Sequence, residues 1–100
     1  MGDFDAMNEI LTQVRDVIVL ARQGAYGDPS VQHQVTADQF RAYVKAKYGL
    51  DIPFDGEDTC VFNIHQKLAR HACGAPKKDT PADIIGYGAN LWACMEDARP

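Results

Sequence analysis

Long apolar runs and an excess of positive charge are both missing from this 100-residue chain. No run approaches the ~20 apolar residues that a membrane-crossing helix needs. The first residues have neither the basic start nor the apolar stretch of a secretory signal. Ten Lys and Arg residues against fourteen Asp and Glu residues give a net charge of −4. This balance argues against binding to a DNA or RNA backbone, for which a basic surface is expected. It is compatible with a local cationic pocket that holds one small anion.

Cysteine and histidine are too few and too scattered for the common disulfide and metal sites. The cysteines are Cys60, Cys73 and Cys94. Their odd number and wide spacing fit neither a disulfide framework nor a CxxC metal pair, so we expect reduced, mostly buried thiols in a cytosolic protein. The histidines lack metal-ligand spacing; we expect His65 at the edge of the core and His33 in a loop. No Gly-rich phosphate loop, nucleophile elbow or Cys/His dyad is present in the sequence.

What the chain does contain is helical periodicity. Over residues 5–23, apolar side chains recur at three- and four-residue steps and make one continuous stripe. The members of this stripe are Met7, Ile10, Leu11, Val14, Val17, Ile18 and Ala21. We expect Asp5 to cap this helix and Gly24 to end it. The glycines, Asp28 and Pro29 that follow predict a shaped loop.

Three more helices are predicted further along the chain. The first is expected to begin with a capping box at Thr36 and to end at Gly49. The next covers residues 57–73 and ends at a glycine. Its expected core side comprises Val61, Phe62, Ile64, Leu68, Ala69 and Ala72. The last helix is expected to start with Thr80 as its cap and Pro81 in its first turn, which is the preferred order of these residues.

The last helix is apolar on more than one side. Its apolar residues are Ile84, Ile85, Tyr87, Leu91, Trp92, Cys94 and Met95. Such a helix is either central in the fold or at a contact between subunits. A chain this short buries only ~60–65% of its unfolded surface, so we expect a homo-oligomer. Strand alternation and internal repeats are absent from the sequence, which predicts a single all-α domain over residues 1–100, a small four-helix bundle.

Polar side chains share one face of the helix at 57–73. Asn63, Lys67 and Arg70 lie at four- and three-residue steps, with His71 beside them. A solvated helix face would account for this pattern. The alternative is a phosphate site, in which Arg70 acts as a bidentate fork and Lys67 as a point charge.

The last helix offers a carboxylate that could complete such a site. Asp83 could favour the helix N-terminus electrostatically, pair with Lys67 or Arg70, or hold a metal. Gly86 and Gly88 each cost ~1 kcal/mol inside a helix relative to Ala. We therefore expect the backbone at these glycines to approach another helix or a ligand closely.

The loop after the first helix is the third candidate element. Tyr26 and Asp28 lie among glycines shortly after Arg22. A turn alone would explain this composition. The same residues could also form the rim of a site for a base or a ribose.

Three short segments, "RQGAYGDP", "QKLAR" and "DTPADIIGYGANL", occur in this order. Together they resemble the YGDP-type loop, Lys-x-x-Arg helix and Asp-Ile-x-Gly-Tyr helix of a family of small phage proteins. That family is in turn similar to the MazG-like all-α nucleotide pyrophosphohydrolases. The resemblance covers about residues 8–97. It implies a MazG-like all-α fold, a nucleotide ligand and, for a phage-encoded chain, the host cytoplasm.

The carboxylates that the MazG-like resemblance implies are only partly present. Those enzymes bind Mg²⁺ through an EExxE helix followed by an ExxD helix. Asp83 matches the Asp of the second motif, Thr80 replaces its Glu, and Asp79 is displaced by one position. Where the EExxE carboxylates would stand, this chain has Asn63, Gln66, Lys67 and Arg70. Mg²⁺-assisted hydrolysis needs several oxygen ligands, so the sequence argues against it.

We therefore expect a protein that binds, and sequesters, a phosphorylated nucleotide without robust hydrolysis and without a cofactor or metal. In a phage setting the ligand would be a host nucleotide signal, which implies an anti-defence role. The expected ligand-binding residues are Lys67, Arg70, Asp83, Tyr26, Asp28, Arg22, Asn63 and Tyr87. A first alternative is a Mg²⁺-dependent nucleotide pyrophosphohydrolase that uses the carboxylates of Asp83, Asp79, Glu57 and Asp58. A second is a protein–protein interaction module whose polar cluster is an internal salt-bridge network.

Overall fold

The structure, a computed structural model, describes residues 2–20 and 27–97. Over these residues it contains helices and no strand, which confirms the predicted all-α class. Four α-helices are present in the described part, with a π-helical segment continuing the first. They are α1 (Asp3–Gln13), η1 (Val14–Leu20), α2 (Pro29–Tyr48), α3 (Gly56–Cys73) and α4 (Asp79–Asp97).

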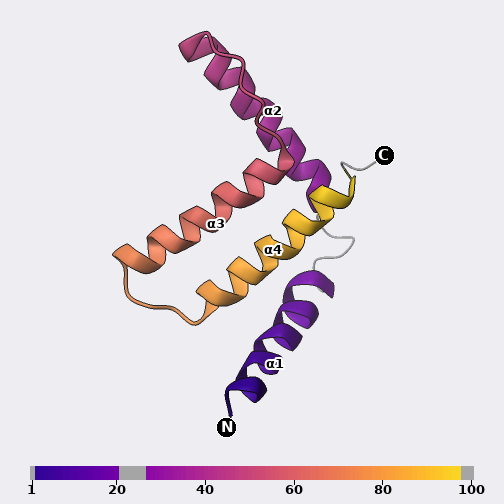
Figure 1. Ribbon diagram of the computed structural model, residues 1–100, viewed down its shortest axis with the longest axis vertical. Helices are drawn as coiled ribbons and strands as arrows, with labels where there is room; N and C mark the ends of the chain where they lie inside the picture. Colours follow the sequence, from indigo (N-terminus) through magenta and orange to yellow (C-terminus); the bar gives the residue numbers. More distant parts are fainter. Residues whose placement is uncertain (1, 21–26, 98–100) are drawn as a thin grey trace.

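Helix α4 lies at the centre of the arrangement. It runs antiparallel to α3, with α1 on its other side, and α2 starts near its C-terminal end (Figure 1). Among the described elements, α4 contacts α1, η1, α2 and α3. Of the two explanations for its broad apolar surface, a central position is therefore the one that the fold shows.

The first helix begins earlier than predicted. Its N-cap is Gly2, so Asp5 is not the cap but lies with Asp3 in the first turn, where a carboxylate favours the positive end of the helix dipole. The helix continues into η1, which contains the β-branched run from Val17 to Val19. The predicted end at Gly24 lies outside the described residues.

The predicted start of α2 at Thr36 is wrong. The helix begins at Pro29 with Asp28 as N-cap, since proline at the first helical position has a suitable φ and needs no N–H partner. Thr36 lies inside the helix, and its hydroxyl donates to the Gln32 carbonyl at 3.0 Å. His33 consequently lies on this helix and not in a loop. The predicted end at Gly49 is confirmed, with a left-handed φ of 69° that favours glycine.

Helix α3 follows its predicted range to within one residue. The N-terminus of α3 is fixed by a capping box, in which Asp55 accepts from the Asp58 N–H and the Asp58 carboxylate accepts from the Asp55 N–H. Helix α4 starts at Asp79, so Thr80 lies in its first turn and is not the cap that the sequence predicted.

The core that one chain builds is small. Its buried apolar residues are Val14, Ala37, Val44, Cys60, Ala82 and Cys94. Helix α3 directs Thr59 and Cys60 inward, whereas Phe62 is 55% and Leu68 48% exposed. The predicted apolar side of α3 is therefore largely uncovered, because only α2 and α4 pack against this helix in the described chain. His65, expected at the edge of the core, is exposed.

The molecule is correspondingly elongated, with principal extents of 54 × 35 × 23 Å. Its radius of gyration is 15.8 Å, whereas a compact chain of this length has about 13 Å. No helix in the described part of the chain combines the length and apolar character of a membrane-crossing segment.

Candidate functional site

A hollow of about 580 Å³ opens where α3 ends and α4 begins. The short connection between two antiparallel helices brings the last two turns of α3 beside the first two turns of α4 (Figure 1). The polar residues that line the hollow are Lys67, Arg70, Lys77, Asp79, Thr80 and Asp83. This lining includes three of the residues that the sequence predicted at a ligand: Lys67, Arg70 and Asp83.

An ion pair between the two helices lines the hollow. The Lys67 ammonium lies 3.1 Å from the Asp83 carboxylate. The two side chains are only 21% and 32% exposed, so water screens the pair less than it screens a surface pair. The pairing fixes the position of the Lys67 ammonium at the wall of the hollow. One of the roles that the sequence left open for Asp83 is therefore the one observed.

Arg70 and Lys77 add two cations that are not neutralised locally. Both side chains are exposed and line the hollow, and neither takes part in an ion pair within the described residues. The hollow thus has three cationic and two acidic side chains in a chain whose net charge is −4. The positive end of the α4 dipole points to the same place, because α4 starts at Asp79. The local electrostatics favour an anion.

Of the other predicted ligand residues, those that the structure describes lie outside the hollow. Asn63 and Tyr87 are half-buried and lie one helical turn deeper than Lys67 and Asp83, and neither lines the hollow. Asp28 caps α2, which starts at the opposite end of the α3–α4 pair (Figure 1). The 18 residues of α3 span roughly 27 Å. The structure therefore does not bring Asp28 to the hollow. Tyr26 and Arg22 lie outside the described residues.

Sequence reasoning did not place Lys77, Thr80 and Cys73 at the site, although all three line the hollow. Lys77 belongs to the short segment that joins α3 to α4. The sequence could have indicated Lys77, because it lies between the helix that ends with Lys67 and Arg70 and the helix that starts at Asp79. A short connection must stay close to both helix ends.

The described residues contain no group of three or more His, Cys, Asp or Glu side chains that could together hold a metal ion. The hollow offers two carboxylates, Asp79 and Asp83, and the second is already held by Lys67. Of the carboxylates in the enzyme alternative, Asp58 is engaged in the capping box at the far end of α3. A donor set with more cations than carboxylates suits a phosphate better than Mg²⁺.

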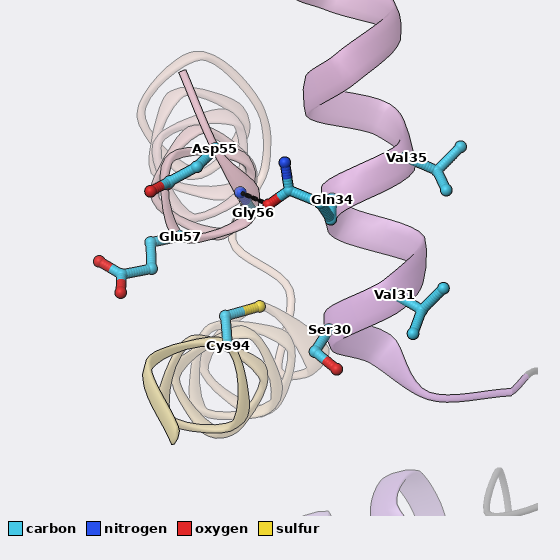
Figure 2. A pocket seen from close by; sticks show the side chains of 8 residues that line it. All are labelled: Ser30, Val31, Gln34, Val35, Asp55, Gly56, Glu57 and Cys94. Atoms are coloured by element: carbon cyan, nitrogen blue, oxygen red, sulfur yellow. Dashed lines mark hydrogen bonds between the residues drawn. The ribbon is translucent and has the colours of Figure 1, made fainter. Parts of the chain in front are cut away.

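A second cleft, of about 370 Å³, lies at the other end of the helix pair, between α2, the start of α3 and the end of α4. Gln34 points from α2 across this space, and its Oε1 accepts from the Gly56 N–H at 3.0 Å, while Glu57 points away (Figure 2). The Sγ atoms of Cys94 and Cys60 lie 3.8 Å apart in a buried contact. Burial, together with the nearby Cys94 thiol, raises the pKa of Cys60 to about 12. These groups hold helices together and offer no cation to an anionic ligand.

The comparisons with known proteins give a family but no activity. Residues 9–96 match the family model described as a domain of unknown function, DUF6378. No curated protein and no solved structure matches the chain.

Proposed function

We propose that the chain, which belongs to the DUF6378 family, binds a phosphorylated small molecule in the hollow between α3 and α4 and holds it without hydrolysing it. One observation carries the proposal: Arg70 and Lys77 line the hollow without an ion-pair partner in the described residues, beside a Lys67 that Asp83 holds in place. Pockets for small ligands commonly enclose about 300–1,000 Å³, so a hollow of about 580 Å³ is large enough for a nucleotide.

Each side chain has a distinct role in this proposal. Arg70 presents the planar fork that matches two phosphate oxygens, and Lys77 closes over the ligand from the connecting segment. Lys67 contributes a point charge whose position Asp83 maintains. The Thr80 hydroxyl, at the start of α4, supplies a neutral donor to the same oxygens.

A nucleotide is the ligand class that we favour, on the strength of the resemblance to MazG-like proteins. Sequestration follows from the chemistry of the hollow. Cations beside a divalent metal would repel it at short distance, and two carboxylates offer few of the oxygen ligands that Mg²⁺ needs. In this proposal the protein acts in a phage-infected host cytoplasm, where it withdraws a nucleotide signal from use.

The binding proposal is tested with protein purified from cells, by native mass spectrometry for a co-purifying nucleotide and by calorimetry with nucleoside phosphates, dinucleotides and cyclic nucleotides. Arg70→Ala and Lys77→Ala should each lose about 1.5–3 kcal/mol of binding, the range for charge-assisted hydrogen bonds, which corresponds to at least about tenfold in Kd. Arg15→Ala, which removes an exposed cation of η1, is the matched control and should bind like wild type. Equal affinity of all variants would refute the site.

The hydrolase remains a second candidate because Asp79 and Asp83 lie one turn apart on α4 and both line the hollow. Wild type and Asp83→Asn are incubated with each nucleotide, with and without Mg²⁺ or Mn²⁺, and the products are separated by chromatography. We expect intact nucleotide in every sample, with binding to Asp83→Asn only moderately weakened. Metal-dependent release of pyrophosphate or a monophosphate by wild type, lost in the variant, would establish the hydrolase instead.

A further inference from the structure

The second half of α2 extends beyond the rest of the molecule. Residues 40–48, together with the loop 49–55 that runs back along them, form a projection at one end of the long axis (Figure 1). We call this projection the arm. It is held together by its own contacts: the rings of Phe40 and Phe54 lie 5.0 Å apart, and the Arg41 guanidinium donates to the Phe54 carbonyl at 3.4 Å. The arm is therefore a built element of the fold and not a frayed helix end.

The outer surface of the arm is aromatic and basic. Tyr43 and Tyr48 are both more than half exposed, and the Lys47 ammonium lies 5.7 Å and 5.2 Å from their ring centroids. Arg41 and Lys45 form ion pairs with nearby carboxylates, at 3.4 Å and 3.0 Å. Lys47 has no carboxylate partner within the described chain. The arm thus presents two tyrosine rings and one cation that its own acidic groups do not neutralise.

The opposite end of the molecule carries a complementary surface, the outer face of α1. Phe4 is 78% exposed, and Met7 and Leu11 are more than half exposed. They lie at three- and four-residue steps, so they form one apolar stripe. Asp3 and Asp5 flank Phe4, and neither takes part in an ion pair in the described part of the chain.

These two surfaces cannot meet within one chain. Among the described elements α1 contacts only η1 and α4, and the N-terminus of α1 and the arm lie at opposite ends of the 54 Å axis (Figure 1). One surface is aromatic with an excess cation, and the other is apolar with excess carboxylates. Complementary patches at opposite ends of one molecule fit a second copy of the same chain.

We propose that two copies pair antiparallel, so that the arm of each covers the α1 face of the other. The same contact then occurs twice, as a two-fold axis requires, and the pair closes on itself without growing into a filament. Tyr43 and Tyr48 of one copy cover Phe4 and Met7 of the other, and Lys47 meets Asp3 and Asp5. The sequence suggested α4 as the contact between subunits. In the fold α4 is central, although its Trp92 is 61% exposed, so the proposed contact uses other surfaces.

Charge reversal tests the pairing directly. Lys47→Glu places a carboxylate opposite Asp3 and Asp5, and Asp3→Lys/Asp5→Lys places cations opposite Lys47. Each variant alone should associate at least about tenfold more weakly than wild type, because both contacts of the pair become repulsive. An equimolar mixture of the two variants should regain the pair, because both contacts then join opposite charges. Sedimentation at tens of micromolar reports the mass, and wild type should have twice the 11.0 kDa of one chain.

Lys78→Glu is the matched control. It reverses one cation in the segment between α3 and α4, away from both surfaces, and should sediment like wild type. Lysines in the first turn of α1 oppose the helix dipole, so circular dichroism checks that α1 still forms in Asp3→Lys/Asp5→Lys. The neutral variant Asp3→Asn/Asp5→Asn avoids this effect and should associate with an affinity between those of wild type and the lysine variant. A monomeric wild type, single variants that associate like wild type, or a mixture that associates no better than its components would each overturn the proposal.

Discussion

At the scale of single residues, hydrogen bonds join α2 to α3. The Thr59 hydroxyl, on α3, donates to the His33 carbonyl of α2 at 3.0 Å, and Gln34 accepts from the Gly56 N–H at 3.0 Å. Thr59 is buried, so the bond that its hydroxyl makes is shielded from water. The junction also encloses part of the His33 side chain, and this desolvation lowers the pKa of His33 below its usual 6.5.

This lowered pKa predicts that the protein loses stability as the pH falls. Below about pH 6.5 the unfolded chain binds a proton at His33 more readily than the folded chain does, so the free energy of unfolding decreases from that pH down to the folded-state pKa. Urea unfolding between about pH 8 and pH 5 measures the slope. His33→Gln should make it shallower, whereas His65→Gln, at an exposed position of α3, should leave it unchanged. Equal slopes in the two variants would exclude His33 as the cause.

At the scale of helices, the glycines of α3 and α4 have different surroundings. A methyl group at Gly56 would lie 3.3 Å from the Gln34 backbone nitrogen, so α2 and α3 pack closely there. At Gly86 the nearest atom, a methyl carbon of Ile18, would lie at an ordinary 3.5 Å, and at Gly88 nothing lies within 4 Å. Close backbone approach was predicted for the glycines of α4, but between described residues it occurs at the start of α3.

Two alanine substitutions test this difference. Gly88→Ala should stabilise the fold by about 0.5–1 kcal/mol, because alanine forms helices more readily and its methyl group meets nothing. Gly56→Ala should destabilise it by roughly 1 kcal/mol, since the methyl group must displace the α2 backbone. Thermal and urea unfolding of both variants give the two values. A stabilising Gly56→Ala would show that α2 can shift without cost.

Helix ends were predictable where a local signal determines them. Gly49 ends α2 because its φ of 69° suits glycine, and the range of α3 followed from its flanking residues. The start of α2 was missed because Asp28 and Pro29 were interpreted as a turn, although the same pair is a good helix start. The periodicity of α3 correctly indicated a helix but not whether Phe62 and Leu68 are covered, since an apolar pattern does not specify what lies against it.

At the scale of the whole molecule, the candidate site was predictable in part. Lys67 and Arg70 share a helix face, and the short connection to α4 brings Asp83 beside them. Asp28 could not be placed from sequence, because the direction of α2 relative to α3 decides at which end of the helix pair it lies. The same elongated arrangement leaves the arm and the outer face of α1 uncovered, which has a consequence for thermal stability.

If each arm covers the α1 face of a second copy, folding and association are linked. Wild-type Tm should then rise with protein concentration, because pairing stabilises the folded chain by mass action. For a chain of this length, a 100-fold increase in concentration should raise Tm by on the order of 5 °C. Lys47→Glu should show a lower Tm that barely changes with concentration, whereas Lys78→Glu should follow wild type. Differential scanning calorimetry over that range makes the measurement. A wild-type Tm independent of concentration would mean that each chain unfolds alone, with its apolar α1 face exposed to water.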